Sequence, residues 1–262
     1  MLDILYQDAT LVAINKPTGL LLHRSAIDRH ETRFALQLLR DQIGQRVYPV
    51  HRLDKPTSGV LVFALDRETA AQLAAAFTTG EVHKLYIAVV RGYTAEEGTI
   101  DYPLRVEPDR MTDRDARQDK GPQTALTDYR RLAGVELPVR VDRYPSSRYS
   151  LIETAPRTGR KHQIRRHMKH IAHPIVGDTT YGKSRHNRLF LERFGSTRLL
   201  LHARSLAFHH PATVQALTIT APLDEAFGNV LKQLGWYEMI GRGSTPHQPL
   251  PGAQTPPATH PP

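Results

Sequence analysis

Residues 51–65 read HRLDKPTSGVLVFAL, a stretch that joins a polar turn to an apolar run. The apolar end of the stretch is typical of a buried strand. Pro56 restricts the residue before it to extended conformations, and the Thr-Ser-Gly that follows favours a turn. The stretch therefore predicts a tight turn that presents Asp54 beside the start of a buried strand, between the basic residues Arg52 and Lys55.

Asp54 allows two interpretations. Aspartate often caps a turn by accepting hydrogen bonds from backbone amides, and this one could do the same. The alternative is a nucleophile, because nearby cations favour the ionised carboxylate that a nucleophile requires. The density of polar neighbours, which include His51, Thr57 and Ser58, favours the second interpretation.

Short apolar runs bounded by turn residues predict further strands. Ile4 to Tyr6 and Leu11 to Ile14 are expected to pair, Leu85 to Val90 to form a buried strand, and Val214 to Ile219 to form a late one. Strands outnumber the predicted helices and do not alternate with them regularly. This favours an α+β fold with a mixed, mainly antiparallel sheet over a doubly wound parallel sheet.

Three segments carry helix patterns. Asp66 can cap a helix with one apolar face, and Gly80 can end that helix. A second helix is predicted over Lys161 to Ile171, and a third over Asp224 to Leu234.

The chain is strongly basic: its 262 residues hold 35 Lys and Arg against 26 Asp and Glu, a formal net charge of +9. This excess favours a phosphate-rich partner, although a basic surface can also serve solubility alone. The absence of cysteine excludes disulfides and thiolate chemistry. We see no signal peptide and no apolar run long enough to span a membrane, so we expect a cytoplasmic protein.

We expect one catalytic domain over residues 1–240, because no change in composition divides this part of the chain. Residues 241–262 hold seven prolines and almost no large apolar residue, which predicts a disordered tail. Arg105 to Lys120 is dense in Arg and Asp, and predicts either a solvated surface loop or an RNA-contacting insertion.

Residues 84–92 read KLYIAVVRG, and the alternation of a strand places Lys84 and Tyr86 on the same face. Tyr86 could be an ordinary core aromatic. It could instead stack on a nucleobase, with its hydroxyl close enough to the reacting atom to help move a proton.

Residues 156–170 read PRTGRKHQIRRHMKH. On a helix, Ile164 and Met168 face the core. Arg160 and Lys161 would lie at the helix start, where free amides also favour phosphate. Arg165 adjoins the apolar stripe, so it could be drawn inward and would then need an anionic partner. The histidines have spacings that metal ligands can use, but flanking cations oppose a metal ion and no carboxylate joins them, so we predict no metal site.

These segments, with NKPTGLLLH at residues 15–23, follow the order and spacing of the pseudouridine synthases of the RluA type, which the sequence resembles over almost all of residues 1–235. The resemblance implies the pseudouridine synthase fold, a central mixed and mainly antiparallel sheet in two half-domains with flanking helices and an active cleft between them. It also implies isomerisation of uridine to pseudouridine in RNA, with no cofactor and no metal.

On the matching positions, the resemblance implies that Asp54 is the nucleophile, that Tyr86 stacks against the target base and that Arg165 pairs with Asp54. Arg52 matches an arginine that fills the gap left in the RNA when the uridine is flipped out. The residues predicted to bind RNA are Lys16, His51, Arg52, Arg160, Lys161 and Arg166.

Within the family, residues 118–123 and 144–149 most resemble the branch that modifies uridine at position sixty-five of transfer RNA. The Lys-Pro-x-Gly motif begins at residue 16, so we expect none of the extra RNA-binding domain that many ribosomal RNA enzymes carry before it. We expect a monomer that acts on tRNA without a protein partner. The alternatives are a synthase for ribosomal RNA, a non-catalytic RNA-binding protein and, less well supported because acidic residues do not cluster, a metal-dependent nuclease.

Overall fold

The computed structural model describes residues 1–23, 32–105 and 121–240. The strands are β1 (Asp3–Gln7), β2 (Leu11–Lys16), β3 (Tyr48–Pro49), β4 (Ser58–Ala64), β5 (His83–Arg91), β6 (Glu97–Asp101), β7 (Leu126–Leu137), β8 (Ser147–Pro156), β9 (Leu201–His209) and β10 (Ala216–Thr220). The helices are α1 (Ala35–Ile43), α2 (Arg67–Thr79), α3 (Gln163–His170), α4 (Ser184–Phe194) and α5 (Glu225–Gln233), with a short 3-10 helix at Tyr237–Ile240. None of these described helices is long and apolar enough to cross a membrane.

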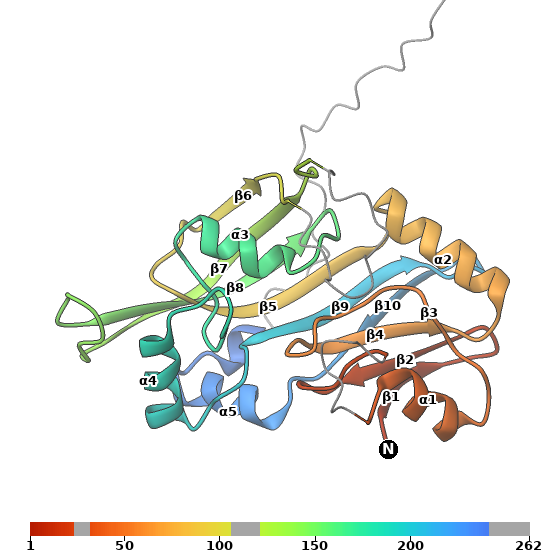
Figure 1. Ribbon diagram of the computed structural model, residues 1–262, viewed down its shortest axis with the longest axis horizontal. Coiled ribbons are helices and arrows are strands. Elements are labelled where there is room, and N and C mark those ends of the chain that lie inside the picture. The colour runs from red at the N-terminus through yellow and green to blue at the C-terminus, as the bar shows by residue number, and fades with distance from the viewer. Residues whose placement is uncertain (24–31, 106–120, 241–262) are drawn as a thin grey trace, which may run out of the picture.

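One mixed sheet runs through the molecule (Figure 1). Its main path follows the order β1-β2-β4-β9-β5-β8-β7-β6, with β3 paired to β4 and β10 paired to β9. Among the described strands, β4 and β9 form the single parallel pair and the other pairs are antiparallel. The predicted α+β fold with a mixed, mainly antiparallel sheet is therefore confirmed.

Each half of the sheet is covered by helices on both faces (Figure 1). In the half built from β1, β2 and β4, α1 packs on one face through Leu39 and α2 packs on the other through Leu73. In the half built from β5, β7 and β8, α3 packs on one face through Met168, while Phe190 of α4 and Phe227 of α5 pack on the other. Each half thus has apolar side chains buried on both of its faces.

The two halves meet at β9. This strand pairs with β5 over six residue pairs but with β4 over two alone, Ser58 with His202 and Gly59 with Ala203. We call this two-pair contact the seam. Gly59 has a φ of 115°, and a Cβ atom there would lie 2.1 Å from the carbonyl oxygen of Ala203. The close approach of β4 to β9 therefore requires glycine at this position.

Several predicted elements are confirmed. β1 and β2 pair as expected, and β4 and β5 form where the two buried strands were predicted. Asp66 caps α2 by accepting a hydrogen bond from the backbone N–H of Thr69 at 2.8 Å, and Gly80 ends the helix in the left-handed conformation. The helices α3 and α5 form inside the predicted ranges and are shorter at both ends.

Other elements differ from the predictions. The late strand β10 begins at Ala216 because Val214 lies in a turn with a φ of 58°, which a strand does not allow. The sequence analysis missed α1 and α4, neither of which has a side-chain hydrogen bond at its N-cap, so both lack the usual start signal. It also missed the long hairpin of β7 and β8. The predicted tail over residues 241–262 and most of the predicted loop, residues 106–120, lie outside the described residues.

Candidate active site

The turn that carries Asp54 joins β3 to β4, and the loop after β2 holds it in place. The backbone N–H of Thr57 donates to the carbonyl of Asp54 at 3.0 Å and closes the turn. The carbonyl of Lys55 accepts two hydrogen bonds from the neighbouring loop, one from the ammonium of Lys16 at 3.1 Å and one from the backbone N–H of Gly19 at 2.8 Å. The backbone next to Asp54 is therefore fixed by two residues, Lys16 and Gly19, that do not line the cleft described below.

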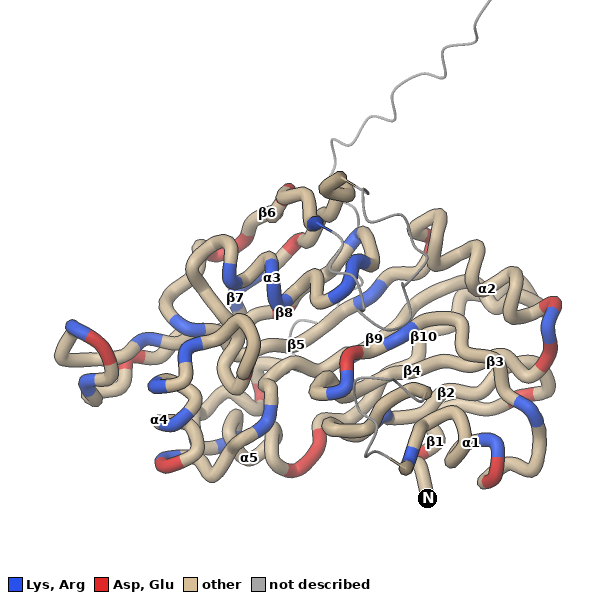
Figure 2. Tube along the Cα trace, in the orientation of Figure 1, with Lys and Arg blue, Asp and Glu red and all other residues tan. Residues whose placement is uncertain are grey.

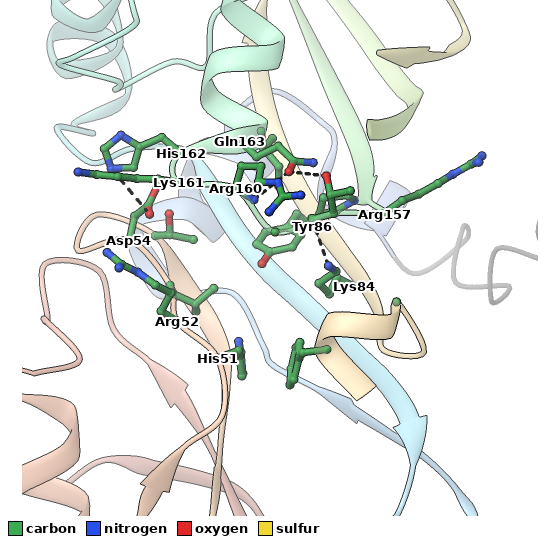
Figure 3. Close-up of a pocket in the computed structure, with 18 of the residues that line it drawn as sticks. His51, Arg52, Asp54, Lys84, Tyr86, Arg157, Arg160, Lys161, His162 and Gln163 are labelled. Atoms are coloured by element: carbon green, nitrogen blue, oxygen red, sulfur yellow. Dashed lines mark hydrogen bonds and ion pairs between the residues drawn. The ribbon is translucent and has the colours of Figure 1, made fainter. Parts of the chain in front are cut away.

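The side chain of Asp54 points into a cleft (Figure 3). Its carboxylate is 18% exposed, and its Oδ2 atom accepts a hydrogen bond from Nη1 of Arg165 at 3.3 Å. The turn is closed by the backbone carbonyl of Asp54, which leaves the carboxylate available to the cleft. This geometry favours the nucleophile over the turn cap that the sequence also allowed.

Arg165 is buried in α3 and has two carboxylate partners. Its Nε and Nη2 atoms donate to the two carboxylate oxygens of Asp178, at 2.7 and 2.9 Å, and Nη1 faces Asp54. The side chain is only 5% exposed. A bidentate pair of this kind fixes both the position and the plane of the guanidinium group. Arg165 is therefore a rigid positive charge beside Asp54.

Asp178 was missed by the sequence analysis, although Arg165 was expected to need an anionic partner. Burial opposes ionisation of the Asp178 carboxyl, but hydrogen bonds from Arg165 and from the backbone N–H groups of Tyr181 and Thr180 outweigh it, so its pKa lies below the usual value. The Asp178 side chain is fully buried. A Gly-Asp pair directly after the apolar residues Ile175 and Val176 was the available signal.

Tyr86 lies on β5 and lines the same cleft as Asp54 (Figure 3). Burial raises the pKa of its phenol, and the negative charge of Asp54 raises it further. The phenol therefore stays protonated at neutral pH. The ring offers a flat surface in the cleft, and its hydroxyl is a hydrogen-bond donor.

His162 is a second residue whose place the sequence analysis did not foresee, because it was weighed there only as a metal ligand. It precedes α3 in the left-handed conformation, with a φ of 55°, which is uncommon for a residue other than glycine. Its Nδ1 atom lies 2.9 Å from the hydroxyl of Tyr181, and its Nε2 atom lies 3.9 Å from Oδ1 of Asp54. Such strained residues cluster at functional sites.

The cleft has a volume of about 790 Å³ and is lined from both halves of the sheet. The Asp54 turn and the end of α2 form one side, while β5 and the loop between β8 and α3 form the other. Figure 2 shows Lys and Arg gathered on α3 and on the loop before it. The site is thus a single carboxylate in an electropositive cleft, a place suited to a polyanion such as RNA.

Comparison with known proteins supports this chemistry. Residues 10–170 match the family described as RNA pseudouridylate synthase, which is more than half of the chain. The chain belongs to this family. The RluA-type resemblance seen in the sequence is thereby confirmed.

Among curated relatives, a tRNA pseudouridine synthase C of Vibrio cholerae is 55% identical over 240 residues, which are 92% of this chain and 98% of that protein. A tRNA pseudouridine synthase C of Haemophilus influenzae is 53% identical over 236 residues, which are 90% of this chain and 99% of that protein. Among solved structures, human RNA Pseudouridylate Synthase Domain Containing 4 is 30% identical with a TM-score of 0.66, covering 89% of this chain and 93% of that chain. The predicted pseudouridine synthase fold is confirmed by this likeness.

In this RNA pseudouridylate synthase, the three residues predicted to be catalytic line one cleft. Asp54 comes from the turn before β4, Tyr86 from the middle of the sheet and Arg165 from α3. They are far apart in the sequence, so their meeting depends on the pairing of β4, β9 and β5. Their catalytic roles remain predictions.

The predicted RNA-binding residues differ in position and accessibility. Arg52, Arg160 and Lys161 line the cleft and are exposed or half-buried, so RNA can reach them. Arg166 is outside the cleft lining and donates to the carbonyl of Arg105 at 3.0 Å.

His51 lines the cleft with a stacked ring, 4.5 Å from the ring of Phe77. Its Nε2 atom accepts a hydrogen bond from the backbone N–H of Val62. Burial lowers the pKa of His51 to about 3, and the charge of Lys84 acts in the same direction. The neutral ring can offer an aromatic surface to RNA but no positive charge.

Lys16 does not occupy the RNA-accessible position that was predicted for it. Its side chain is fully buried, and its ammonium donates to the backbone carbonyls of Pro17, Leu20 and Lys55. Direct contact with RNA is therefore wrong for this residue, because no surface of it is accessible. Burial lowers the pKa of Lys16 to about 7 against the opposing attraction of Asp54. Lys16 instead joins the loop after β2 to the turn of Asp54.

Metal-ligating residues do not gather in the part of the chain that the structure describes: it contains no group of three or more His, Asp or Glu side chains placed to hold a metal ion. His162 and His167 of the histidine-rich segment point to separate partners, the hydroxyl of Tyr181 and that of Thr127.

Proposed function

We propose that this enzyme isomerises a uridine of tRNA to pseudouridine and that Asp54 is its catalytic carboxylate. The observation that carries the proposal is the convergence of Asp54, Arg165 and Tyr86 in one electropositive cleft. The assignment to tRNA is supported by the relatives named tRNA pseudouridine synthase C, which are 51–55% identical to this chain over most of their length.

Access to the base comes first. A uracil stacked in a folded RNA cannot reach a cleft of this kind, so it must leave its stack at a cost of a few kcal/mol. Phosphate contacts from Arg52, Arg160 and Lys161, which line the cleft, offset this cost. Arg52 lies next to Asp54 on the same turn and is placed to occupy the space that the base vacates.

The chemistry needs one anion close to the nucleoside that reacts. The N1–C1′ bond of uridine breaks and a C5–C1′ bond forms; C5 loses a proton and N1 gains one, so the reaction is balanced without oxidant, reductant or second substrate. The carboxylate of Asp54 can attack C1′, attack C6 or remove the 2′-proton. Each route uses the carboxylate as an anion, and Arg165, which Asp178 holds rigid, places its guanidinium against that carboxylate.

Tyr86 supports the base in this scheme. Its ring is a stacking surface beside the carboxylate, and base–aromatic stacking contributes about 1–3 kcal/mol. Because the pKa of its phenol is raised, Tyr86 remains protonated and can donate a hydrogen bond to the rotating uracil. It is a poor base for the C5 proton at neutral pH.

Substitution of Asp54 by Asn tests the catalytic role, because it preserves the shape of the side chain and removes its charge. We expect Asp54→Asn to bind tRNA with unchanged affinity and to lose pseudouridine formation by about 10³-fold or more. Tritium release from RNA labelled at C5 of uridine measures the product, and filter binding measures the affinity. Normal turnover by this variant would remove Asp54 from the mechanism, and a wild type that binds RNA without tritium release would indicate a non-catalytic RNA-binding protein.

The substrate is tested by supplying tRNA and ribosomal RNA transcripts separately. We expect modification of tRNA at the uridine of position sixty-five, and none after that uridine is replaced by cytidine. Modification of the ribosomal transcript alone would overturn the assignment to tRNA. We further propose that the enzyme is a cytoplasmic monomer; light scattering after size exclusion, with and without tRNA, measures its mass.

A further inference from the structure

Lys84 is a half-buried cation in the cleft to which the scheme above gives no role. It lies on β5, two residues before Tyr86, so both side chains leave the same face of the strand about 6.6 Å apart. In Figure 3 the ring of Tyr86 lies between Asp54 and Lys84. Lys84 therefore stands in the cleft beyond the base platform, on the side away from the catalytic carboxylate.

The charge of Lys84 lacks an anion. Its Nζ atom donates to the carbonyl of Thr158 at 3.2 Å, and no carboxylate of the described residues lies within ion-pair distance of it. Burial lowers the pKa of Lys84 to about 8. Lys16, by contrast, uses all three of its donors on carbonyls. The Lys84 ammonium therefore retains donors for a ligand in the cleft, and a half-buried charge is best stabilised by an anion.

We propose that Lys84 binds a backbone phosphate of the RNA next to the flipped uridine and so holds the strand across Tyr86. The anion that RNA supplies is phosphate, and a neutral uracil carbonyl would leave the half-buried charge uncompensated. This inference rests on the proposed function for its ligand. It makes Lys84 a binding residue that acts before the chemical step, with no part in the reaction at Asp54.

The neighbourhood of Lys84 predicts how this contact depends on pH. The other titratable or charged side chains of the cleft lining are His51, Arg52, Asp54, Tyr86, Arg157, Arg160, Lys161, His162 and Arg165. His51 is neutral because its pKa is about 3, and Tyr86 keeps its proton because its pKa is raised. The arginines remain charged. Loss of the Lys84 proton between pH 7 and 9 therefore weakens RNA binding, and a bound phosphate opposes that loss.

The decisive experiment compares Lys84→Met, Lys84→Arg and the wild-type enzyme in tRNA binding at several salt concentrations. Met keeps the aliphatic stem, so we expect binding about ten-fold weaker at low salt. The slope of log affinity against log salt should fall by about 0.7–0.9, the contribution of one phosphate contact. Lys84→Arg should restore both. Lys232→Met is the matched control, because Lys232 is exposed on α5 outside the cleft, and it should leave the slope unchanged.

Two further measurements separate this proposal from the function of the site. Under saturating enzyme, Lys84→Met should lose a larger factor in tRNA affinity than in single-turnover tritium release, because Asp54 is intact, and the control Lys232→Met should lose neither. The wild-type affinity should decline from pH 7 to 9 while that of Lys84→Arg stays level. An unchanged salt slope in Lys84→Met, with a thermal unfolding temperature equal to the wild type, would overturn the phosphate contact and leave the proposed reaction standing. If Lys84→Met lost single-turnover rate but kept its affinity for tRNA, the phosphate contact would also be overturned. That result would place Lys84 at the reacting base.

Discussion

The half of the sheet that carries Asp54 and the half that carries Arg165 fix their side chains in different ways. On the Asp54 side, the buried ammonium of Lys16 is bonded to three neutral carbonyls, and the side chain of Asp54 stays 18% exposed. On the Arg165 side, a guanidinium is bonded to a fully buried carboxylate, Asp178. The carbonyls bonded to Lys16 fix the position of the turn that carries Asp54. The ion pair with Asp178 fixes the position of the positive charge on Arg165. The carboxylate of Asp54 is thus positioned by one half and faces a fixed positive charge from the other.

Asp54 and Arg165 can meet only if the seam holds the two halves together. Disruption of the seam should therefore have the largest effect on the stability of the protein. Gly59→Ala places a Cβ atom 2.1 Å from the carbonyl oxygen of Ala203 at a φ of 115°. We expect the variant to lose about 5 kcal/mol or more of the free energy of unfolding, because both backbone strain and strand separation result. Urea denaturation followed by circular dichroism measures the loss.

Gly44→Ala is the matched control for Gly59→Ala. Gly44 also has a positive φ, 70°, but a Cβ atom there meets nothing within 4 Å. We expect it to cost about 1–2 kcal/mol, the price of the left-handed conformation alone. If the two alanine variants lost equal stability, the close contact of β4 with β9 would contribute nothing, and the halves would hold together without it.

Arg165→Ala should have the next largest effect, since it breaks the charged side of the site. The substitution leaves the buried carboxylate of Asp178 without its cation, which costs about 3–5 kcal/mol in comparable cases. It also removes the charge that faces Asp54, so activity should be lost. Urea denaturation gives the stability and tritium release gives the activity.

Arg165→Met combined with Asp178→Asn separates the two losses, because it removes both charges of the buried pair. This double variant should recover part of the stability and none of the activity. The stabilisation by Asp178 has a defined pH dependence, since its folded-state pKa is lowered: it is complete above the ordinary aspartate value near 4 and is lost as the pH falls through the lower one. Equal acid stability of the wild type and the double variant would contradict the role of the pair.

The sequence predicted the secondary structure around the site better than the contacts that hold Asp54 and Arg165 in place. The apolar run of residues 60–65 and the capping residues Asp66 and Gly80 predicted β4 and α2, because local patterns determine such elements. The partner of Arg165 was not predicted, because the Gly-Asp pair at residues 177–178 signals only a turn, and Asp178 approaches Arg165 through the folded loop after α3. Lys16 was predicted to contact RNA, but its burial follows from the packing of two loops that are distant in the sequence, which no local pattern shows.

Lys16→Met tests the half of the sheet in which neutral carbonyls, bonded to Lys16, hold the turn of Asp54. It removes three hydrogen bonds to carbonyls and should cost about 2–3 kcal/mol of stability, less than the loss of Arg165. The larger consequence is kinetic: a turn displaced by about 1 Å would lower kcat by about 10²-fold. The affinity for tRNA should stay within two-fold or so, since the buried side chain does not contact RNA. A weaker tRNA affinity with normal kcat would instead restore the predicted RNA contact.

Substitution of His162 should have the smallest effect on stability. The residue precedes α3, in the half that carries Arg165, but its ring approaches the carboxylate of Asp54 in the other half. Its φ of 55° means that His162→Gly relieves strain while losing the contact with Tyr181, so the stability should change by no more than about 1 kcal/mol. If the ring at 3.9 Å from Asp54 orients the carboxylate, the variant should lose about ten-fold in kcat with unchanged tRNA affinity. His162→Asn, which also tolerates the left-handed conformation, separates backbone from ring. Full activity in both variants would mean that the charged half acts on Asp54 through Arg165 alone, and that His162 serves only the turn before α3.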